Sequence, residues 1–529
     1  MAKVSPNQSV FNTGEISSLL YGRTDYDNYK KALKTSLNGI SLVQGPWTRR
    51  PGTYFAAEVK DSTKATRCVR FEFSTTQAYI IELGDLYMRF YRNNGPVLET
   101  AQNITGITQA NPAVITYSGA DNYANGDDAE ISGIVGMTEL NGRRVRVKNV
   151  NTGANTFEIT DLQGNNIDSS AFTAWSSGGT VARVYTVVTP WAEADLFQLK
   201  FTQSADVLYV AHPSYAPRKI SRTAHTAWTV TSITFLDGPY LAINSTSTTL
   251  TLSATSGTGV TVTASAVTGI NGGSGFRAGD VGRLIRWKDA AGNWTWLTIT
   301  AFTSTTQVTV TVSGNAASAT TATVNWRMGL WNSVDGYPGA VTFFEDRLTW
   351  GGAGGAPSRV DLSKTSDYEN MAPTAATAGT VADDNAIAVT LNSKNVQVIR
   401  WLEDDEKGLF VGTVSGEWII RPSNQNQALS PTNVNAKQST THGSKNIQAV
   451  RAGKATLFVQ RAGRKLRELA YVYEVDGFRS PDMTVLAEHI AKGATVATSG
   501  FVELARQGEP QSIVWAPRAD GILTGFVYE

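Results

Sequence analysis

The stretch FEFSTTQAYIIELGDLYMRFYRNNGPVL, residues 71–98, decides the fold class of this chain. Apolar and polar residues alternate along it, as they do in strands that bury one face. Leu83-Gly84-Asp85-Leu86 and Asn93-Asn94-Gly95 interrupt the alternation with residues that favour tight turns. The stretch therefore predicts a meander of antiparallel strands.

Outward from this meander, five segments repeat one pattern, in which an apolar strand runs into a turn and then into a second strand. They recur every ~40–60 residues once a long insertion is set aside, a spacing typical of propeller blades. We therefore predict a propeller-like domain, with a β-sandwich array as the alternative because the repeat is irregular. The segments are VLYVAHPSYAPRKI (207–220), RLTWGGAGGAPSRVDLS (347–363), GLFVGTVSGEWII (408–420), TLFVQRAGRKLRELAY (456–471) and IVWAPRADGILTGFVY (513–528).

Composition agrees with a mainly β fold and excludes several classes of protein. Gly, Thr, Ser and Val are abundant, and 529 residues are too many for one core, so we expect three or more domains. The chain is 41% hydrophobic and 17% charged with a net charge of +1, which argues against disorder and against nucleic-acid binding by bulk positive charge. No run approaches the ~18–20 apolar residues of a membrane helix. Cys68 is the single cysteine, so neither a disulfide framework nor a thiolate metal cluster is expected.

The N-terminal segment, residues 1–60, is the least strand-like part. Its start has no signal-peptide pattern, so we expect synthesis in a cytosol. Apolar residues recur at three- and four-residue steps across DYDNYKKALKTSL (25–37), which predicts one short amphipathic helix. Asp25 is the expected N-cap, and Asn38-Gly39 the expected end of that helix.

Two stretches look like small β modules inserted into the repeat, at 103–185 and 243–328. Both alternate apolar and polar residues around Gly/Asn turns, and the second opens with a Thr/Ser/Ala/Val-rich run. The first blades are then expected from 61–102 and 186–242, and the remaining blades from 329–529. The chain ends within an expected strand, so we expect the natural protein to continue beyond Glu529.

Residue types that carry catalysis are present but not in catalytic patterns. The four histidines, at 212, 225, 442 and 489, lack the paired spacing of metal ligands. The adjacent pairs Asp127-Asp128, Asp383-Asp384 and Asp404-Asp405 could suggest a glycosidase, but solvated turns explain them better, because adjacent strand residues face opposite ways. No nucleophile elbow or phosphate-binding loop is present. We therefore predict no enzyme activity, no catalytic residues, no metal and no cofactor.

Basic residues cluster at a few places against this neutral background. Their common fate is a solvated or salt-bridged surface. The functional alternative is that they line a lumen or an interface and meet DNA phosphate weakly. The candidates are Arg49 and Arg50, and Arg461, Arg464, Lys465 and Arg467; a further cluster is Arg143, Arg144 and Arg146.

An ordered series of motifs over nearly the whole chain resembles the tail nozzle proteins (tail tubular protein B-like) of short-tailed bacteriophages, the podoviruses. The order is more specific than any single motif, and the insertion at 103–185 is similar to a small β-barrel module of such phage proteins. The motifs are FNTGEIS (11–17), GRTDY (22–26), RRPGT (49–53), FLDGPY (235–240), GYP (336–338), FEDRL (344–348), GEW (416–418) and QRAGR (460–464).

This resemblance implies a structural virion protein of the tail. It implies a ring, commonly a homo-hexamer, below the adaptor or head-to-tail connector, with the N-terminal segment in the ring or adaptor contact. The channel would retain the genome and then conduct it, so double-stranded DNA is a transient partner. Tail fibre or tailspike proteins and the host envelope are further expected contacts, and assembly is expected in the host cytoplasm.

Two other functions remain open from the sequence. The first is a receptor- or glycan-binding tail protein, in which Trp175, Trp294 and Trp296 of the inserted modules stack on sugars. The second is a polysaccharide depolymerase. Packing in a core or an interface is the commoner fate of tryptophan, so we expect the structural role.

Overall fold

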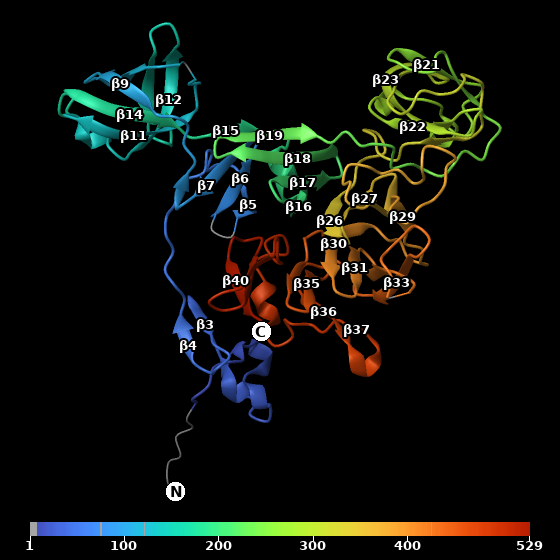
Figure 1. Ribbon diagram of the computed structural model, residues 1–529. Coiled ribbons are helices and arrows are strands. Elements are labelled where there is room, and N and C mark those ends of the chain that lie inside the picture. The colour runs from blue at the N-terminus through green and yellow to red at the C-terminus, as the bar shows by residue number, and fades with distance from the viewer. Residues whose placement is uncertain (1–7, 75–76, 121, 425, 529) are drawn as a thin grey trace.

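Figure 1 shows the chain, a computed structural model, as a set of small sheets. The structure describes residues 8–74, 77–120, 122–424 and 426–528. Strands dominate this part, so the prediction of a mainly β protein is confirmed. Residues 1–7 and Glu529 of the predicted terminal segments lie outside the described residues.

Six antiparallel sheets follow one another along the chain. The first sheet contains the predicted meander of residues 71–98. Its strand order is β15-β7-β6-β5, with β8 beside β7. The next four sheets have four strands each in sequence order, and the sixth has three. In the first sheet the strands are β5 (Arg67–Ser74), β6 (Gln77–Gly84), β7 (Tyr87–Arg92), β8 (Gly95–Pro96) and β15 (Thr186–Val188).

The other five sheets are simple meanders. The second contains β16 (Lys200–Ser204), β17 (Val207–His212), β18 (Tyr215–Ala224) and β19 (Ala227–Ser232). The third contains β26 (Ala340–Phe344), β27 (Arg347–Ala353), β28 (Ala356–Leu362) and β29 (Ile387–Thr390). The fourth contains β30 (Ile399–Asp405), β31 (Gly408–Thr413), β32 (Gly416–Arg421) and β33 (Asn435–Thr440). The fifth contains β34 (Val450–Ala452), β35 (Ala455–Val459), β36 (Leu466–Val472) and β37 (Gly477–Arg479). The sixth contains β38 (Ala505–Gln507), β39 (Ile513–Pro517) and β40 (Leu523–Val527).

A hydrophobic cluster lies between each consecutive pair of these sheets. Phe71 and Leu208 belong to the cluster between the first and second sheets, and Trp401 and Phe458 to the one between the fourth and fifth. Further hydrophobic clusters join the second sheet to the third sheet, the third sheet to the fourth, and the fifth sheet to the sixth. Burial of such side chains contributes ~1.5–3 kcal/mol each, so face-to-face packing of neighbouring sheets supplies most of the core.

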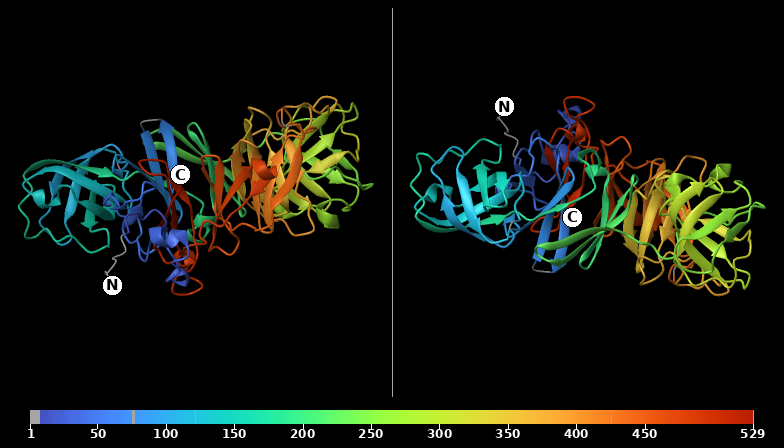
Figure 2. Two further views of the ribbon diagram at one scale, coloured as in Figure 1. Left: turned by 90° about the horizontal axis from the view of Figure 1, so that it is seen from below. Right: turned by 90° about the horizontal axis from the view of Figure 1, so that it is seen from above.

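The two insertions are separate β modules. Strands β9 to β14 close into a six-stranded barrel around a core that includes Phe157 and Ile159. Strands β20 to β25 form a six-stranded sheet around a core that includes Trp287 and Trp326. Their strands are β9 (Gln102–Ile107), β10 (Val114–Ser118), β11 (Asp128–Val135), β12 (Arg144–Asn151), β13 (Thr156–Thr160) and β14 (Ser177–Arg183), then β20 (Leu250–Leu252), β21 (Val260–Ala264), β22 (Leu284–Lys288), β23 (Trp294–Ser304), β24 (Gln307–Val312) and β25 (Trp326–Met328). Figure 2 shows the two modules at opposite ends of an elongated molecule, with the six sheets between them.

The predicted amphipathic helix at 25–37 is wrong. A short 3₁₀ helix, η2 (Asp27–Lys31), is followed at once by β2 (Ala32–Leu33), which pairs in parallel with β1 (Gly14–Glu15). The backbone of the expected helix is held by strand pairing instead, since the Ile16 amide donates to the Leu33 carbonyl at 3.1 Å. The expected N-cap also fails, because the Asp25 carboxylate bonds the Arg23 guanidinium at 2.7 Å.

The N-terminal segment also contains a small hairpin. The other helical turns of the described part are short. The hairpin is β3 (Gly39–Ser41) with β4 (Trp47–Arg49). Asn38, predicted to end a helix, has a positive φ of 54° and leads directly into β3. The remaining 3₁₀ helices of the described part are η1 (Ser18–Leu20), η3 (Thr138–Leu140), η4 (Glu193–Gln198), η5 (Asn271–Gly273), η6 (Ala278–Asp280), η7 (Tyr473–Val475) and η8 (Glu488–Ala491).

Candidate functional site

A cavity of about 140 Å³ lies where four of the six sheets meet, and we call it the four-sheet cavity. Arg67 and Lys200 are the first residues of β5 and β16, while Gln448 and Glu503 each lie two residues before the start of β34 and β38. The cavity thus joins the beginning of the first and second sheets to that of the fifth and sixth. Its lining is Arg67, Phe197, Lys200, Phe201, Ile447, Gln448, Val502, Glu503 and Leu504.

Arg67 is fixed firmly at the wall of this cavity. Its Nη1 donates to the carbonyl oxygens of Leu196 at 2.9 Å and Leu199 at 2.7 Å. Its Nε and Nη2 both lie 2.8 Å from Glu503 Oε1. The guanidinium of this buried side chain also lies 5.3 Å from the centre of the Phe201 ring. Its charge is therefore balanced by Glu503 and its donors are occupied.

Lys200 has much less support than Arg67. Its side chain is 1% exposed, and its Nζ donates to the Asn446 carbonyl oxygen at 3.2 Å. No carboxylate forms an ion pair with it in the described part of the chain. Burial, with repulsion from Arg67 and Arg400, lowers the pKa of Lys200 to about 7, and Glu503 opposes this only in part.

The basic residues predicted as site candidates lie at two places on the surface. Arg461 and Arg464 are exposed in the turn between β35 and β36, and no side-chain partner is found for either within the described ranges. Lys465 pairs with Asp482 at 2.7 Å, and Arg467 Nε donates to Gln460 Oε1 at 2.8 Å. The structure therefore splits this cluster into two solvated arginines and two residues with local partners.

The second pair of basic candidates belongs to the N-terminal segment. Arg49 ends β4 and is exposed. Arg50 Nε donates to Asn38 Oδ1 at 2.9 Å, which ties the end of the hairpin to its beginning. The structure shows no contact between this pair and the β35–β36 turn among the residues it describes.

The solvated-turn interpretation is wrong for one of the acidic pairs. Asp128 is buried and bonds two guanidinium groups, Arg89 Nη1 at 2.7 Å and Arg146 Nε at 2.9 Å. Asp127 beside it pairs with Arg183 at 3.2 Å. Burial was not expected because the arginine partners come from three different strands.

The other acidic pairs and the histidines lie in separate places. Asp383 and Asp384 are exposed, and Asp405 ends a strand at a hairpin turn. His489 contacts Glu15 across the N-terminal segment, with Nε2 2.8 Å from Oε1. No group of three or more His, Cys, Asp or Glu that could hold a metal ion is found in the described residues. Within those same residues, no helix has the length and apolar character needed to cross a bilayer.

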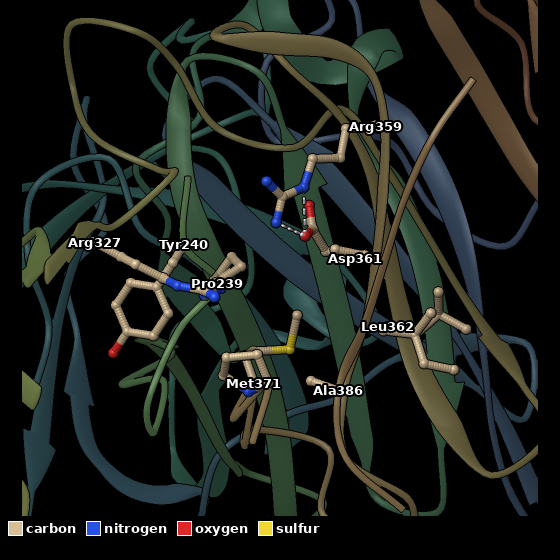
Figure 3. A pocket seen from close by; sticks show the side chains of 11 residues that line it. Pro239, Tyr240, Arg327, Arg359, Asp361, Leu362, Met371 and Ala386 are labelled. Carbon is tan, nitrogen blue, oxygen red and sulfur yellow. Dashed lines mark hydrogen bonds and ion pairs between the residues drawn. The ribbon is translucent and has the colours of Figure 1, made fainter. Parts of the chain in front are cut away.

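A second cavity, shown in Figure 3, is too small for an organic ligand. Its volume is about 50 Å³, against the ~30 Å³ that one water molecule occupies in the liquid. Arg359 Nη2 lies 2.6 Å from Asp361 Oδ1 at its edge. Burial raises the pKa of Asp361, and the bond from Arg359 opposes this rise. The pair is therefore structural.

Both inserted modules are held to the six sheets by buried Arg–Asp pairs. Arg89 of β7 and Asp128 of β11 join the first sheet to the barrel. Arg286 of β22 bonds Asp237, which follows β19, with Nη2 2.9 Å from Oδ2. Arg286 is fully buried, and Trp294 packs against its guanidinium at 4.9 Å. Trp294 is therefore part of a structural junction.

The N-terminal segment, whose last part after β4 is a linker, exposes large apolar side chains. Leu19, Leu37, Tyr54 and Phe55 are each between 74 and 77% exposed. The strands at the start of the segment lie at the lower edge of the molecule in Figure 1, and the linker then runs up to the barrel, where Arg146 Nη2 donates to the Lys60 carbonyl at 2.5 Å. Large exposed apolar side chains on one segment are candidates for an interaction surface. We call these four residues the N-terminal apolar set.

Sequence patterns did not single out the four-sheet cavity. Arg67 and Glu503 bond each other across 436 positions, and no local pattern links them. The available signal was a lysine between apolar neighbours at the start of a strand, Leu199-Lys200-Phe201. A charge at such a position needs a specific environment once the strand is buried.

Comparison with known proteins gives distant likenesses. No family model matches the chain, and no curated protein matches it. One solved structure, a protein from Lactobacillus plantarum, matches with 9% identity and a TM-score of 0.26, covering 78% of this chain and 95% of that one. A "putative 6-phosphogluconolactonase" from Bacteroides fragilis matches with 11% identity and a TM-score of 0.26, covering 72% and 93%. These scores are too low to carry an argument about fold or activity.

Proposed function

We propose that this chain is a structural subunit of a phage tail nozzle, a ring whose channel retains and then conducts the genome. The N-terminal apolar set carries the assembly part of this proposal. Four large side chains on one segment are exposed to water, and burial in a neighbouring subunit would recover ~1.5–3 kcal/mol for each. The ordered motifs of the sequence supply the assignment to a virion tail.

The arrangement of the six sheets supports a propeller-like domain as the body of this subunit. Hydrophobic clusters join consecutive sheets from the first to the sixth, and Arg67 and Glu503 then join the sixth back to the first. A circle of sheets in which each packs only on its neighbours is the architecture of a propeller. Such a body is rigid, as a subunit of a conduit requires.

Charge supports conduction of DNA in preference to tight binding. The net charge is +1, and the buried or ion-paired arginines of the modules are not available to phosphate. Arg461 and Arg464 are exposed and can meet the backbone at a few points. Few phosphate contacts give weak, strongly salt-dependent binding, which suits DNA that must slide.

The expected partners follow from this proposal. Identical subunits would close a ring, most simply a homo-hexamer, through heterologous contacts of the N-terminal segment. The adaptor or head-to-tail connector would lie above it, tail fibres or tailspikes beside it, and the host envelope below. The subunit would join the virion tail during assembly in the host cytoplasm, and we expect no enzymatic activity.

Assembly of the purified chain tests the proposal. Mass photometry should show a particle of about six times the 56.8 kDa chain mass, and negative-stain images should show a ring with a central channel. Replacing Tyr54 and Phe55 together by serine should weaken the assembly at least tenfold. Val281→Ser, an exposed apolar change in the second module, is the matched control and should leave the ring intact.

Other outcomes would contradict the proposal. A chain that stays monomeric at high concentration and never joins tails is not a nozzle subunit. Binding on a glycan array that is lost on Trp296→Ala would instead favour the glycan-binding alternative, since Trp296 is only half-buried. Release of reducing sugar from host polysaccharide, abolished by a single aspartate change, would favour a depolymerase.

A further inference from the structure

We propose that the four-sheet cavity binds a small organic monocarboxylate, whose charged group bonds Lys200 and whose apolar tail fills the cavity. This proposal is independent of the proposed function, since it concerns the inside of one subunit. It rests on charge, on shape and on access, and each of these comes from the residues that line the cavity.

The charge of the cavity is positive and incompletely compensated. Glu503 is committed to Arg67 through two short contacts to one oxygen. Lys200 has one hydrogen bond, to a neutral carbonyl, although an ammonium group has three donors. A buried cation without a counterion is unfavourable unless it finds an anion or loses its proton. An anion beside Lys200 would balance the charge of its ammonium group and accept its remaining hydrogen bonds.

Apart from the amide of Gln448, the remaining walls of the cavity are apolar and exclude a strongly hydrated anion. The aromatic rings of Phe197 and Phe201 and the aliphatic chains of Ile447, Val502 and Leu504 line it. At about 140 Å³ it is similar to an engineered protein cavity that holds one benzene molecule, so about six non-hydrogen atoms fit. A carboxylate with a short aliphatic tail has this size and both of these chemistries.

The cavity is accessible from solvent at its rim. Phe197 is 38% exposed, and the Glu503 side chain is 28% exposed. Lys200, in contrast, is shielded from solvent, since its side chain is 1% exposed. A ligand would therefore enter past Phe197 and Glu503 with its carboxylate leading toward the Lys200 amine and its apolar tail following.

Isothermal titration of the full chain with butyrate tests the inference. Butyrate should bind at pH 6, whereas butyramide, of the same shape but uncharged, should not, and inorganic phosphate should bind at least tenfold more weakly. Lys200→Met should abolish butyrate binding. Lys445→Met is the matched control, because Lys445 is partly buried and, like Lys200, donates to a carbonyl, that of Phe501 at 2.6 Å, but does not line the cavity.

Unmodified protein provides a test that does not depend on folding of the variants. The charged groups facing Lys200 are Arg67, Glu503 and Arg400. Because the amine must carry a proton to hold a carboxylate, butyrate should bind roughly tenfold more weakly at pH 8 than at pH 6. Absence of butyrate binding at tens of millimolar, unchanged binding in Lys200→Met, equal binding of butyramide, or preference for phosphate would each overturn the inference.

Discussion

The guanidinium of Arg89 lies 2.7 Å from the carboxylate of Asp128, and this buried pair joins the first sheet to the barrel inserted within it. Arg146 bonds the other carboxylate oxygen and also reaches the carbonyl of Lys60 in the linker. Three separate parts of the chain are thus fixed by one carboxylate. The barrel is held rigidly, although it is connected to the first sheet by only two strands of backbone.

Arg89→Met should destabilise the protein by about 3 kcal/mol, because it leaves the buried Asp128 with only one cationic partner. Arg143→Met, which removes an exposed guanidinium near Phe172 of the same barrel, should change stability by less than about 1 kcal/mol. Urea denaturation followed by tryptophan fluorescence measures both. Equal effects of the two variants would show that the buried pair contributes nothing special.

Asp237→Ala should destabilise the junction of the second module by about 3–5 kcal/mol, since it leaves the fully buried Arg286 without its counterion. The double variant Asp237→Ala/Arg286→Met should recover part of this loss. Asp25→Ala, which breaks an exposed pair with Arg23, is the control and should leave stability almost unchanged. Thermal unfolding and protease sensitivity of the linker are suitable measurements. A double variant no better than Asp237→Ala would contradict this account.

Lys200→Met should reveal the depressed pKa of this lysine through the pH dependence of stability. The folded pKa of about 7 lies below the unfolded value of 10.5, so Lys200 penalises folding below pH 7 and this penalty disappears as the pH rises to 10.5. The free energy of unfolding of the variant should therefore exceed that of the wild type most at pH 6. This difference should shrink by a few kcal/mol as the pH rises toward 10.5. Denaturation at pH 6, 8 and 10 without added carboxylate checks this, and a constant difference would refute it.

Glu403→Gln should have the opposite pH dependence. Burial raises the pKa of Glu403 to about 8, above its ordinary value of 4.5, and the Gln448 amide bonds its carboxylate at 2.8 Å. Protonation of Glu403 therefore favours the folded state, an advantage complete below pH 4.5 and lost as the pH rises through 8. The glutamine variant should be as stable as the wild type at acidic pH and more stable than the wild type at pH 9. Glu406→Gln, at an exposed site, should show no such change.

The strand pattern of this chain could be predicted because it depends on local periodicity. Each start of the five repeated segments lies in the second strand of a separate sheet: Leu208 in β17, Leu348 in β27, Leu409 in β31, Leu457 in β35 and Val514 in β39. These strands are buried on both faces, so they read as dense apolar runs, which stand out in any sequence.

Features decided by distant contacts were missed or misjudged. The three- and four-residue spacing from Tyr26 to Leu37 suggested a helix, but pairing of Gly14–Glu15 with Ala32–Leu33 determines the backbone there. Asp128 was expected in a solvated turn because none of its arginine partners is adjacent to it. Lys200 and Glu503 meet only after six sheets have packed, so their proximity has no signature within any window of the sequence.

The bond between Arg67 and Glu503 can form only late in the synthesis of the chain. Each hydrophobic cluster between consecutive sheets can form as soon as its second sheet leaves the ribosome, but this bond joins residues 436 positions apart. At ~5–20 residues per second, Arg67 waits from roughly 20 seconds to more than a minute for its partner. The cavity beside it comes into existence only then. Until Glu503 has been synthesised, the nascent chain lacks this contact between the first and sixth sheets.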